Sequence, residues 1–536
     1  MLSPEVLTAN IAALAKAQGK CPTLGALPDS VRVAVSTAGV HLEMRAPGGG
    51  WQGVDFPSGP GADSTWLADG TSPGASQLIV VGVGLGYALA KAERLPIRRV
   101  LAIEPHPGLA TLLLSRSDWR RWFADGRLRL LTGPDYEGAA DVARFLDGLR
   151  DISVVSHPMR VQAEPEVMAH AASVAERVAQ NARANGNARR KFAGPYLLQT
   201  LTNLEAIAAG ADLGALDGAF TGVPAVVAGA GPSLDENARQ LAPLQDRALV
   251  ITADTALRPL LTSGVRPHLA VAVDSSELNA RHVTAADGAE DVMLAAEGSV
   301  HPSAFARFEG RTFGFRISNH EPWPWLRDAA GIERPEVRTW ASVLTSAFQI
   351  ARRAGCNPIV FVGADMAYTG MRPYCRGTIY DAMWQEWMDR GCTWDALMAE
   401  YFSRQPEIWQ ADVRGEPTRT APHLVSFRDW LVDAIAAAAD GTFINATGAG
   451  ILHGRRVRQA SLDEALGDAP RHSGLRELFA ARHAAGTRPA EAARAAELRR
   501  LARTRAVRLP LERWVDFAVS TVSREDILQA LAGPSR

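Results

Sequence analysis

A glycine-rich turn between an apolar run and a helix start is the segment of this sequence best suited to bind an anion. Residues 223–228 are apolar and of strand length, and Gly229 and Gly231 follow them. Glycines let backbone N–H groups approach a ligand without side-chain obstruction. Pro232 suits a first helical turn, and Ser233, with a glutamate three positions later, predicts a capping box. The segment therefore predicts a nucleotide-phosphate site at a helix N-terminus.

Polar residues follow several other apolar runs of strand length. Because the carboxyl ends of parallel strands meet at one edge of a sheet, we expect these residues to line a common cleft. Each one alone could equally be a turn former. Their joint occurrence favours the cleft, and in chain order they are Asp254, Asp274, Ser299, Asp365, Asn445 and Thr447.

Several motifs stand in the order found in one protein family. They are GAGPSLD, ITADTALRPLLTSGVRPHLAVAVDSS, SVLTSAFQIARRAGCNPIVFVGADMAYTGMRPYCRG and INATGAGILHG. The stretch from about 195 to 454 resembles the MAF_flag10 (DUF115) domain of the motility-associated factor glycosyltransferases. Residues 78–107, LIVVGVGLGYALAKAERLPIRRVLAIEPHP, resemble the N-terminal domain that these transferases carry.

The resemblance implies an inverting transferase that moves a nonulosonic acid, of the pseudaminic or legionaminic type, from CMP to serine or threonine of flagellin. It implies a central domain similar in fold to bacterial sialyltransferases. The partners implied are thus flagellin and the CMP-activated sugar. Carried over, the residues of the glycine turn would bind the donor phosphate, and Asp254, Asp274, Ser299, Asp365 and Asn445 would line the cleft. No certain cofactor follows; the carboxylates of the cleft could hold magnesium, and metal dependence stays open.

Such a transfer needs a general base. Breaking the bond to CMP creates oxocarbenium character on the sugar and negative charge on the departing phosphate. A hydroxyl acceptor must also lose its proton, most readily to a histidine or to a carboxylate with a raised pKa. We rank His320 and Asp365 first; the full set of candidates is Asp274, Glu297, His301, His320 and Asp365.

Aromatic and arginine side chains cluster in the loop after residue 365. Tyr368, Tyr374 and Tyr380 suit a sugar site, and Arg372 could bind the carboxylate of the donor. Alternatively, the tyrosines pack beneath the loop and their hydroxyls are satisfied by the backbone.

The alternation of strand and helix patterns predicts an α/β protein. We expect an N-terminal domain over residues 1–160 with a small Rossmann-like unit, a central domain with a parallel sheet over 161–460, and a helical C-terminal domain over 461–536. The central domain opens with long helical patterns, with a break expected at Gly194–Pro195.

A rival interpretation comes from the N-terminal glycines. Gly82, Gly84 and Gly86 follow a strand pattern, and Glu104 ends the next strand, as in class I methyltransferases that use S-adenosylmethionine. Against this, Val80 stands where those enzymes usually have an acid. A scaffold that has lost this function is the alternative.

Two further alternatives concern the whole chain. Archaeal relatives within the DUF115 grouping resemble hydroxymethylpterin pyrophosphokinases that use ATP and magnesium, although they are much shorter. A flagellar chaperone without catalysis is the non-enzymatic possibility.

Composition limits the classes of function. A hydrophobic content of 47% with 21% charged residues is typical of a folded chain, and the net charge of −1 gives no electrostatic case for nucleic acid or membrane partners. The four cysteines form no CxxC pair, so neither a zinc site nor a disulfide framework is predicted. Without a leader or an apolar run of about 20 residues, a cytoplasmic location is expected, with no membrane insertion.

Overall fold

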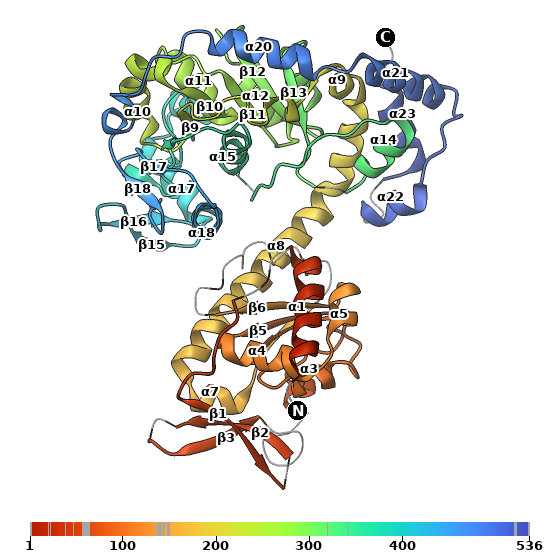
Figure 1. Cartoon of the computed structure of the whole chain (residues 1–536). Coiled ribbons are helices and arrows are strands. Elements are labelled where there is room, and N and C mark those ends of the chain that lie inside the picture. Colours follow the sequence, from red (N-terminus) through yellow and green to blue (C-terminus); the bar gives the residue numbers. More distant parts are fainter. Residues whose placement is uncertain are drawn as a thin grey trace. The chain divides into compact units, whose positions relative to one another are not determined.

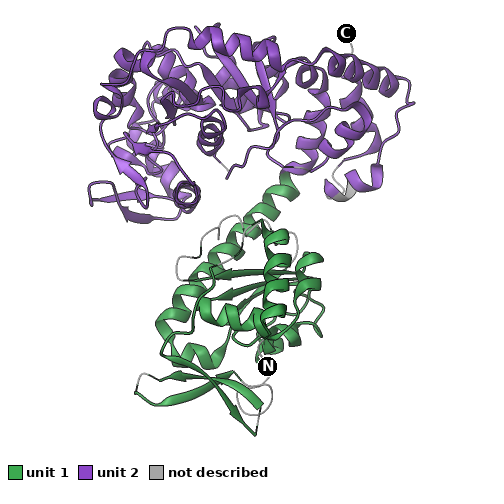
Figure 2. Ribbon diagram, in the orientation of Figure 1, with its two compact units in different colours: residues 1–191 green, residues 192–536 purple. Residues whose placement is uncertain are grey.

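The chain folds into two compact units, residues 1–191 and residues 192–536 (Figure 2). The computed structural model describes residues 3–19, 21, 23–37, 39–46, 48–55, 65–133, 136, 142, 145–146, 151–318, 320–340, 342–518 and 522–533 (Figure 1).

The first unit contains a parallel four-stranded sheet of order β6-β5-β4-β7 and a separate antiparallel sheet of order β1-β2-β3. The parallel sheet confirms the small Rossmann-like unit predicted from the sequence. The two central strands, β4 and β5, are apolar and buried between their end residues, as parallel strands covered on both faces are. The elements are α1 Pro4–Gln18, β1 Val31–Ser36, β2 Gly39–Arg45, β3 Trp51–Asp55, α2 Thr65–Asp69, β4 Gln77–Val81, α3 Tyr87–Ala92, β5 Arg99–Glu104, α4 Pro107–Arg116, α5 Arg120–Ala124, β6 Leu128–Thr132, β7 Ile152–Ser156 and α7 Pro158–Ala163.

Helix α8, Pro165–Thr202, runs without a break through the position where two helices were expected to separate. Pro195 lies inside it, so the prediction of a break at Gly194–Pro195 is wrong. Proline removes only one backbone hydrogen bond, and the turns that follow are fixed because Leu197 and Leu201 are completely buried in the core of the second unit.

The second unit is built on a nine-stranded parallel sheet of order β18-β17-β14-β9-β10-β11-β12-β13-β8. The strand order reverses at β9, which pairs with β10 on one side and β14 on the other. Such a reversal is where open α/β sheets bind ligands, beyond the carboxyl ends of the strands. The strands are β8 Ala211–Asp212, β9 Ala225–Ala228, β10 Leu249–Ala253, β11 Leu269–Ala272, β12 Met293–Glu297, β13 Thr312–Phe315, β14 Ile359–Val362, β17 Phe443–Asn445 and β18 Val457–Gln459.

Helices cover both faces of this sheet. Val226 and Val250 pack with α10 and α11 on one face, and Phe361 and Phe443 meet Phe348 of α15 on the other, as the period of two in a strand requires. The helices of this part are α9 Leu204–Ala209, η2 Leu213–Leu216, α10 Leu234–Leu241, η3 Ala242–Arg247, α11 Asp254–Thr262, α12 Glu277–Thr284, α13 Pro302–Arg307, α14 Trp323–Ala330 and α15 Val343–Arg353.

An insert, which we define as residues 369–421, leaves the sheet after β14. It contains η4 Thr369–Met371, α16 Ile379–Asp389, α17 Trp394–Ser403 and the hairpin of β15 Ile408–Ala411 and β16 Pro417–Thr420. Helix α18, Pro422–Ala436, returns the chain to β17.

Helices α19 Leu462–Leu466, α20 Leu475–Gly486, α21 Pro489–Arg503, α22 Leu511–Phe517 and α23 Arg524–Ala532 form the C-terminal part. They belong to the second unit by their contacts, and Trp514 of α22 meets Trp325 of α14 edge to face at 5.0 Å. The fold class is therefore as predicted: a central parallel α/β sheet, a smaller Rossmann-like N-terminal part and a helical C-terminal part.

Candidate functional site

The two glycine amides of the turn after β9 are used within the fold. Gly229 donates its N–H to the carbonyl of Val362 at 2.9 Å, and Gly231 donates to the carbonyl of Gly363 at 2.8 Å. Pro232 has no N–H to donate. The expectation that these amides form a phosphate nest is contradicted, because the loop after β14 already uses them.

The carboxylate of Asp365 lies where the anion was expected. It accepts hydrogen bonds from the Ser233 amide at 3.3 Å and from the hydroxyls of Ser233 and Thr369, both at 2.6 Å. A Cβ on Gly231 would lie 2.1 Å from Asp365 Oδ2, so glycine is required there to admit an internal carboxylate. The predicted capping box is also wrong, since the Ser233 hydroxyl caps no helical amide.

Asp365 serves as an anchor for the turn. Its side chain is 1% exposed, and burial raises its pKa while the hydrogen bonds from Ser233 and Thr369 lower it. Both hydroxyls donate to Oδ1, and Oδ2 accepts from the Ser233 amide at 3.3 Å, so each oxygen of this carboxylate already has a partner within the fold.

The two residues predicted after β17 are likewise occupied within the fold. Asn445 donates to the Leu452 carbonyl at 2.9 Å and accepts from the Thr447 amide at 3.1 Å, and Thr447 Oγ1 accepts from the Ala364 amide at 3.1 Å. Both side chains are buried. They hold the β14 and β17 loops together, which contradicts an open role in lining the cleft.

Three further candidate bases, Glu297, His301 and His320, already have partners within the fold. His320 packs against Phe517 of α22 at 5.6 Å, and His301 caps α13 by accepting from the Ser303 amide at 3.3 Å. Glu297 is buried and accepts from both the amide and the hydroxyl of Ser299. Ser299 is therefore a partner of Glu297 rather than an open cleft residue.

Tyr368 and Arg372 belong to the packing of the insert. Tyr368 is 3% exposed, packs on Phe402 at 4.9 Å and donates its hydroxyl to Gln405. Arg372 pairs with Asp381 at 3.1 Å and lies 4.6 Å from the ring of Trp394. The alternative interpretation of packed tyrosines holds for Tyr368, and the Arg372 guanidinium already has a carboxylate partner.

A different group forms at the ends of β10 and β11. We call Asp254, Asp274, His282, Tyr374 and Tyr380 the acid–tyrosine cluster. The rings of Tyr374 and Tyr380 stack at 4.7 Å, and His282 of α12 meets Tyr380 at 5.2 Å. Asp254 begins α11, and Asp274 follows β11.

The charges of these groups act on one another. The pKa of Asp254 is raised to about 7, first by burial and also by the Asp274 carboxylate, although the amide and hydroxyl of Thr255 lower it. The pKa values of both tyrosines are raised, first by burial and also by the Asp254 charge. The cluster therefore combines a carboxyl group that titrates near neutrality with two phenols that stay protonated, a combination suited to proton transfer.

His282 was not predicted to take part. It is 2% exposed, burial lowers its pKa to about 4, and its Nε2 has no hydrogen-bond partner. Asn279, one helical turn earlier, accepts from the Tyr380 hydroxyl at 3.3 Å. Only the helical spacing of Asn279 and His282 after the Asp274 motif could have indicated a shared face.

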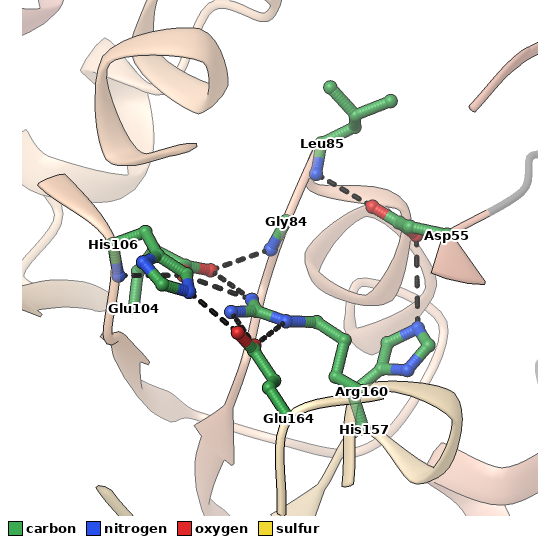
Figure 3. A network of polar contacts seen from close by, with 8 residues as sticks. All are labelled: Asp55, Gly84, Leu85, Glu104, His106, His157, Arg160 and Glu164. Carbon is green, nitrogen blue, oxygen red and sulfur yellow. Dashed lines mark hydrogen bonds and ion pairs between the residues drawn. The ribbon is translucent and has the colours of Figure 1, made fainter. Parts of the chain in front are cut away.

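The glycine turn of the first unit is closed by its own acids (Figure 3). Glu104 is completely buried, accepts the Gly84 amide at 2.9 Å and pairs with Arg160 through contacts of 2.9 and 2.7 Å. Asp55 accepts the Leu85 amide at 2.7 Å. Glu104 is thus unable to bind a ribose in this arrangement, and the scaffold alternative is favoured over a methyltransferase.

Arg160 has a second partner in this network. Its Nε donates to Glu164 at 2.8 Å, and Glu164 also contacts His106 at 2.6 Å (Figure 3). Two carboxylates thus enclose one guanidinium in the interior.

Comparison with known proteins agrees with this architecture. Residues 198–371 match the family model described as 6-hydroxymethylpterin diphosphokinase MptE-like. The solved structure of MAf glycosyltransferase from Magnetospirillum magneticum AMB-1 is similar over 99% of this chain and 89% of that one, with a TM-score of 0.51 and 16% identity. A search of curated proteins finds no significant match. Residues 198–371 thus match an MptE-like family model, and the fold of the chain is similar to that of a MAf glycosyltransferase, in agreement with the resemblance drawn from the motifs.

Two general properties of the described residues bear on membrane and metal binding. None of their helices combines the length and the apolar character that crossing a bilayer requires. No three histidine, cysteine or acidic side chains among them lie together as a possible metal site.

Proposed function

We propose that this protein is a glycosyltransferase that moves a nonulosonic acid from CMP to serine or threonine hydroxyls of flagellin, with inversion at the anomeric carbon. The observation that carries the proposal is the acid–tyrosine cluster, which lies at the carboxyl edge of the sheet in a fold similar to that of a glycosyltransferase. The reaction takes place at the ends of β10 and β11, beside the glycine turn.

Asp254 is the general base in this mechanism. Its Oδ1 accepts from the Thr255 amide at 2.7 Å and hydroxyl at 3.0 Å, and Oδ2 takes the proton. As the acceptor oxygen attacks the anomeric carbon, its proton passes to Asp254 and the bond from that carbon to the CMP phosphate breaks. A carboxyl group with a pKa of about 7 is matched to this work at neutral pH.

Tyr374 and Tyr380 serve the leaving group. Both phenols are protonated at neutral pH and donate hydrogen bonds to the phosphate as its charge grows, Tyr380 by exchanging its bond to Asn279 for one to the phosphate. Asp274, which is exposed, maintains the raised pKa of Asp254 by its charge.

Magnesium would fit the same pair of acids. Mg²⁺ is bound through one or two carboxylates together with substrate phosphates, and Asp254 and Asp274 are the acids available for this. Assays run in parallel with magnesium and with EDTA test this dependence.

The experiment that tests the function is incubation of purified protein with flagellin and a panel of CMP-sugars, followed by intact-mass measurement. We expect one or more additions of nonulosonic acid mass with release of CMP. No mass change with any CMP-nonulosonate, together with transfer from another donor, would contradict the proposal.

The second candidate is pyrophosphate transfer from ATP to a hydroxymethylpterin, which the family match over residues 198–371 favours. That match leaves most of the insert and the whole first unit unexplained. Thermal stabilisation distinguishes the two, because a ligand that binds the native state raises the unfolding midpoint. CMP without metal should stabilise the transferase, whereas ATP with magnesium should stabilise the kinase.

A further inference from the structure

A hollow of about 560 Å³ lies in the insert and is lined by residues of α17 and of the β15–β16 hairpin. Met398 and Phe402 of its lining are buried, whereas Asp395 and Glu407 are exposed. The residues that line it are Met371, Trp394, Asp395, Met398, Ala399, Phe402, Ser403, Gln405, Glu407 and Arg419.

A line of aromatic rings joins this hollow to the acid–tyrosine cluster. From Tyr380 of the cluster, the ring of Trp384 lies at 6.3 Å, and Trp384 lies 5.5 Å from Trp394 in the hollow. With the Tyr374–Tyr380 stack, four neighbouring rings connect the two places. An extended polypeptide, at about 3.3 Å per residue, covers this path with about five residues.

The chemistry of the hollow selects its occupant. Asp395 and Glu407 outnumber Arg419 among the charged residues that line the hollow, so its net charge is negative and favours a cationic side chain. Met371 and Met398 can adapt to different apolar side chains because methionine is flexible and polarisable. Trp409, which is 52% exposed and donates to Glu407 at 2.8 Å, extends the apolar surface beyond the rim.

We infer that the hollow is a docking subsite for the acceptor polypeptide, which inserts an apolar side chain flanked by a lysine or arginine about five residues from the modified hydroxyl. This inference rests on the proposed function, whose donor chemistry occurs in the cluster. The insert thereby selects the polypeptide, while the ends of the strands carry out the transfer.

The hollow also connects to the anchored glycine turn. Tyr368 donates to Gln405, which lines the hollow, and the next residue, Thr369, donates to Asp365. Tyr368 and Thr369 thus link the lining of the hollow to Asp365, the carboxylate that fixes the glycine turn.

Filling the hollow tests the inference. Ala399 is exposed and lines the hollow, so Ala399→Trp adds bulk there without opening the core. We expect its Kd for flagellin, measured by biolayer interferometry without donor, and its KM for flagellin each to rise about tenfold, as loss of an interface anchor does. Release of CMP from the donor in the absence of flagellin should be unchanged. Ala396→Trp is the matched control, because Ala396 is exposed on the same helix and does not line the hollow.

Two further arms separate the outcomes. Asp395→Lys should weaken binding of flagellin less than Ala399→Trp, and replacing the apolar residue of flagellin near the modified site should remove the difference between Ala399→Trp and the parent. An unchanged Kd for Ala399→Trp, no binding of flagellin by the parent protein, or a changed KM for the CMP-sugar alone would overturn the inference. Absence of CMP release with normal binding of flagellin would instead count against the proposed function.

Discussion

The two strand–glycine turn–helix segments of this chain look alike in sequence and end differently. Each turn is closed by an internal carboxylate, Glu104 in the first unit and Asp365 in the second. In the first unit that carboxylate is paired with a buried arginine. In the second, the neighbouring strands add Asp254 and Asp274 beside two phenols. Glycine in such a turn therefore indicates that another group, here a carboxylate, approaches the backbone closely. The residues at the neighbouring strand ends determine whether the site can catalyse a reaction.

Replacing the proposed base should have the largest effect. Asp254→Asn should lower kcat about 10²–10⁴-fold, the contribution of a positioned general base. Thermal unfolding provides the control. Because the folded-state pKa of Asp254, about 7, lies above the value of about 4 in unfolded chains, its contribution to stability is present at low pH and is lost as pH rises through 7. The variant should thus be at least as stable as the parent at alkaline pH. A variant less stable than the parent at alkaline pH would contradict a raised pKa of Asp254.

Breaking the buried ion pair of the first unit should reduce stability rather than chemistry. Arg160→Met leaves Glu104 buried without its cation, which costs about 3–5 kcal/mol. Denaturant-induced unfolding, with proteolysis of the first unit as the readout, measures this loss of unfolding free energy. The double variant Arg160→Met with Glu104→Gln should recover most of the loss, and its release of CMP should equal that of the parent.

S-adenosylmethionine that protected the parent from unfolding would restore the methyltransferase hypothesis.

Asp365 distinguishes an anchor from a base. Asp365→Asn keeps a carbonyl oxygen that accepts from Ser233 and Thr369, so we expect most of the activity to remain. Asp365→Ala leaves buried donors unsatisfied and should cost about 1–3 kcal/mol in unfolding free energy. If the asparagine variant lost turnover as completely as Asp254→Asn while staying folded, Asp365 would have to be a catalytic residue.

The smallest effect concerns pH. Activity should rise with pH through about 7 as Asp254 loses its proton. Asp274→Asn removes a negative charge that raises the pKa of Asp254, so the rising limb of the kcat/KM profile should move to lower pH. A shift to higher pH, or no shift, would mean that Asp274 does not act on the base.

The sequence predicted the sheet and its strand ends well, and the identity of the site less well. Apolar runs ending in polar residues are local patterns, so the sequence placed Asp254 and Asp274 at strand ends, where the structure has them. Whether a polar side chain faces a ligand or the fold depends on contacts between distant segments, such as Asp365 with Ser233. His282 was missed because one histidine on a helix carries no signal without Tyr380, which lies nearly a hundred residues away.

The central claim is that the donor binds at the acid–tyrosine cluster, and a crystal structure with CMP tests it most directly. We expect the phosphate within hydrogen-bonding distance of the Tyr374 and Tyr380 hydroxyls, on the side of Asp254. Density for CMP against the amides of the Gly229–Ser233 turn with Asp365 displaced, or beside Glu104 in the first unit, would contradict the account.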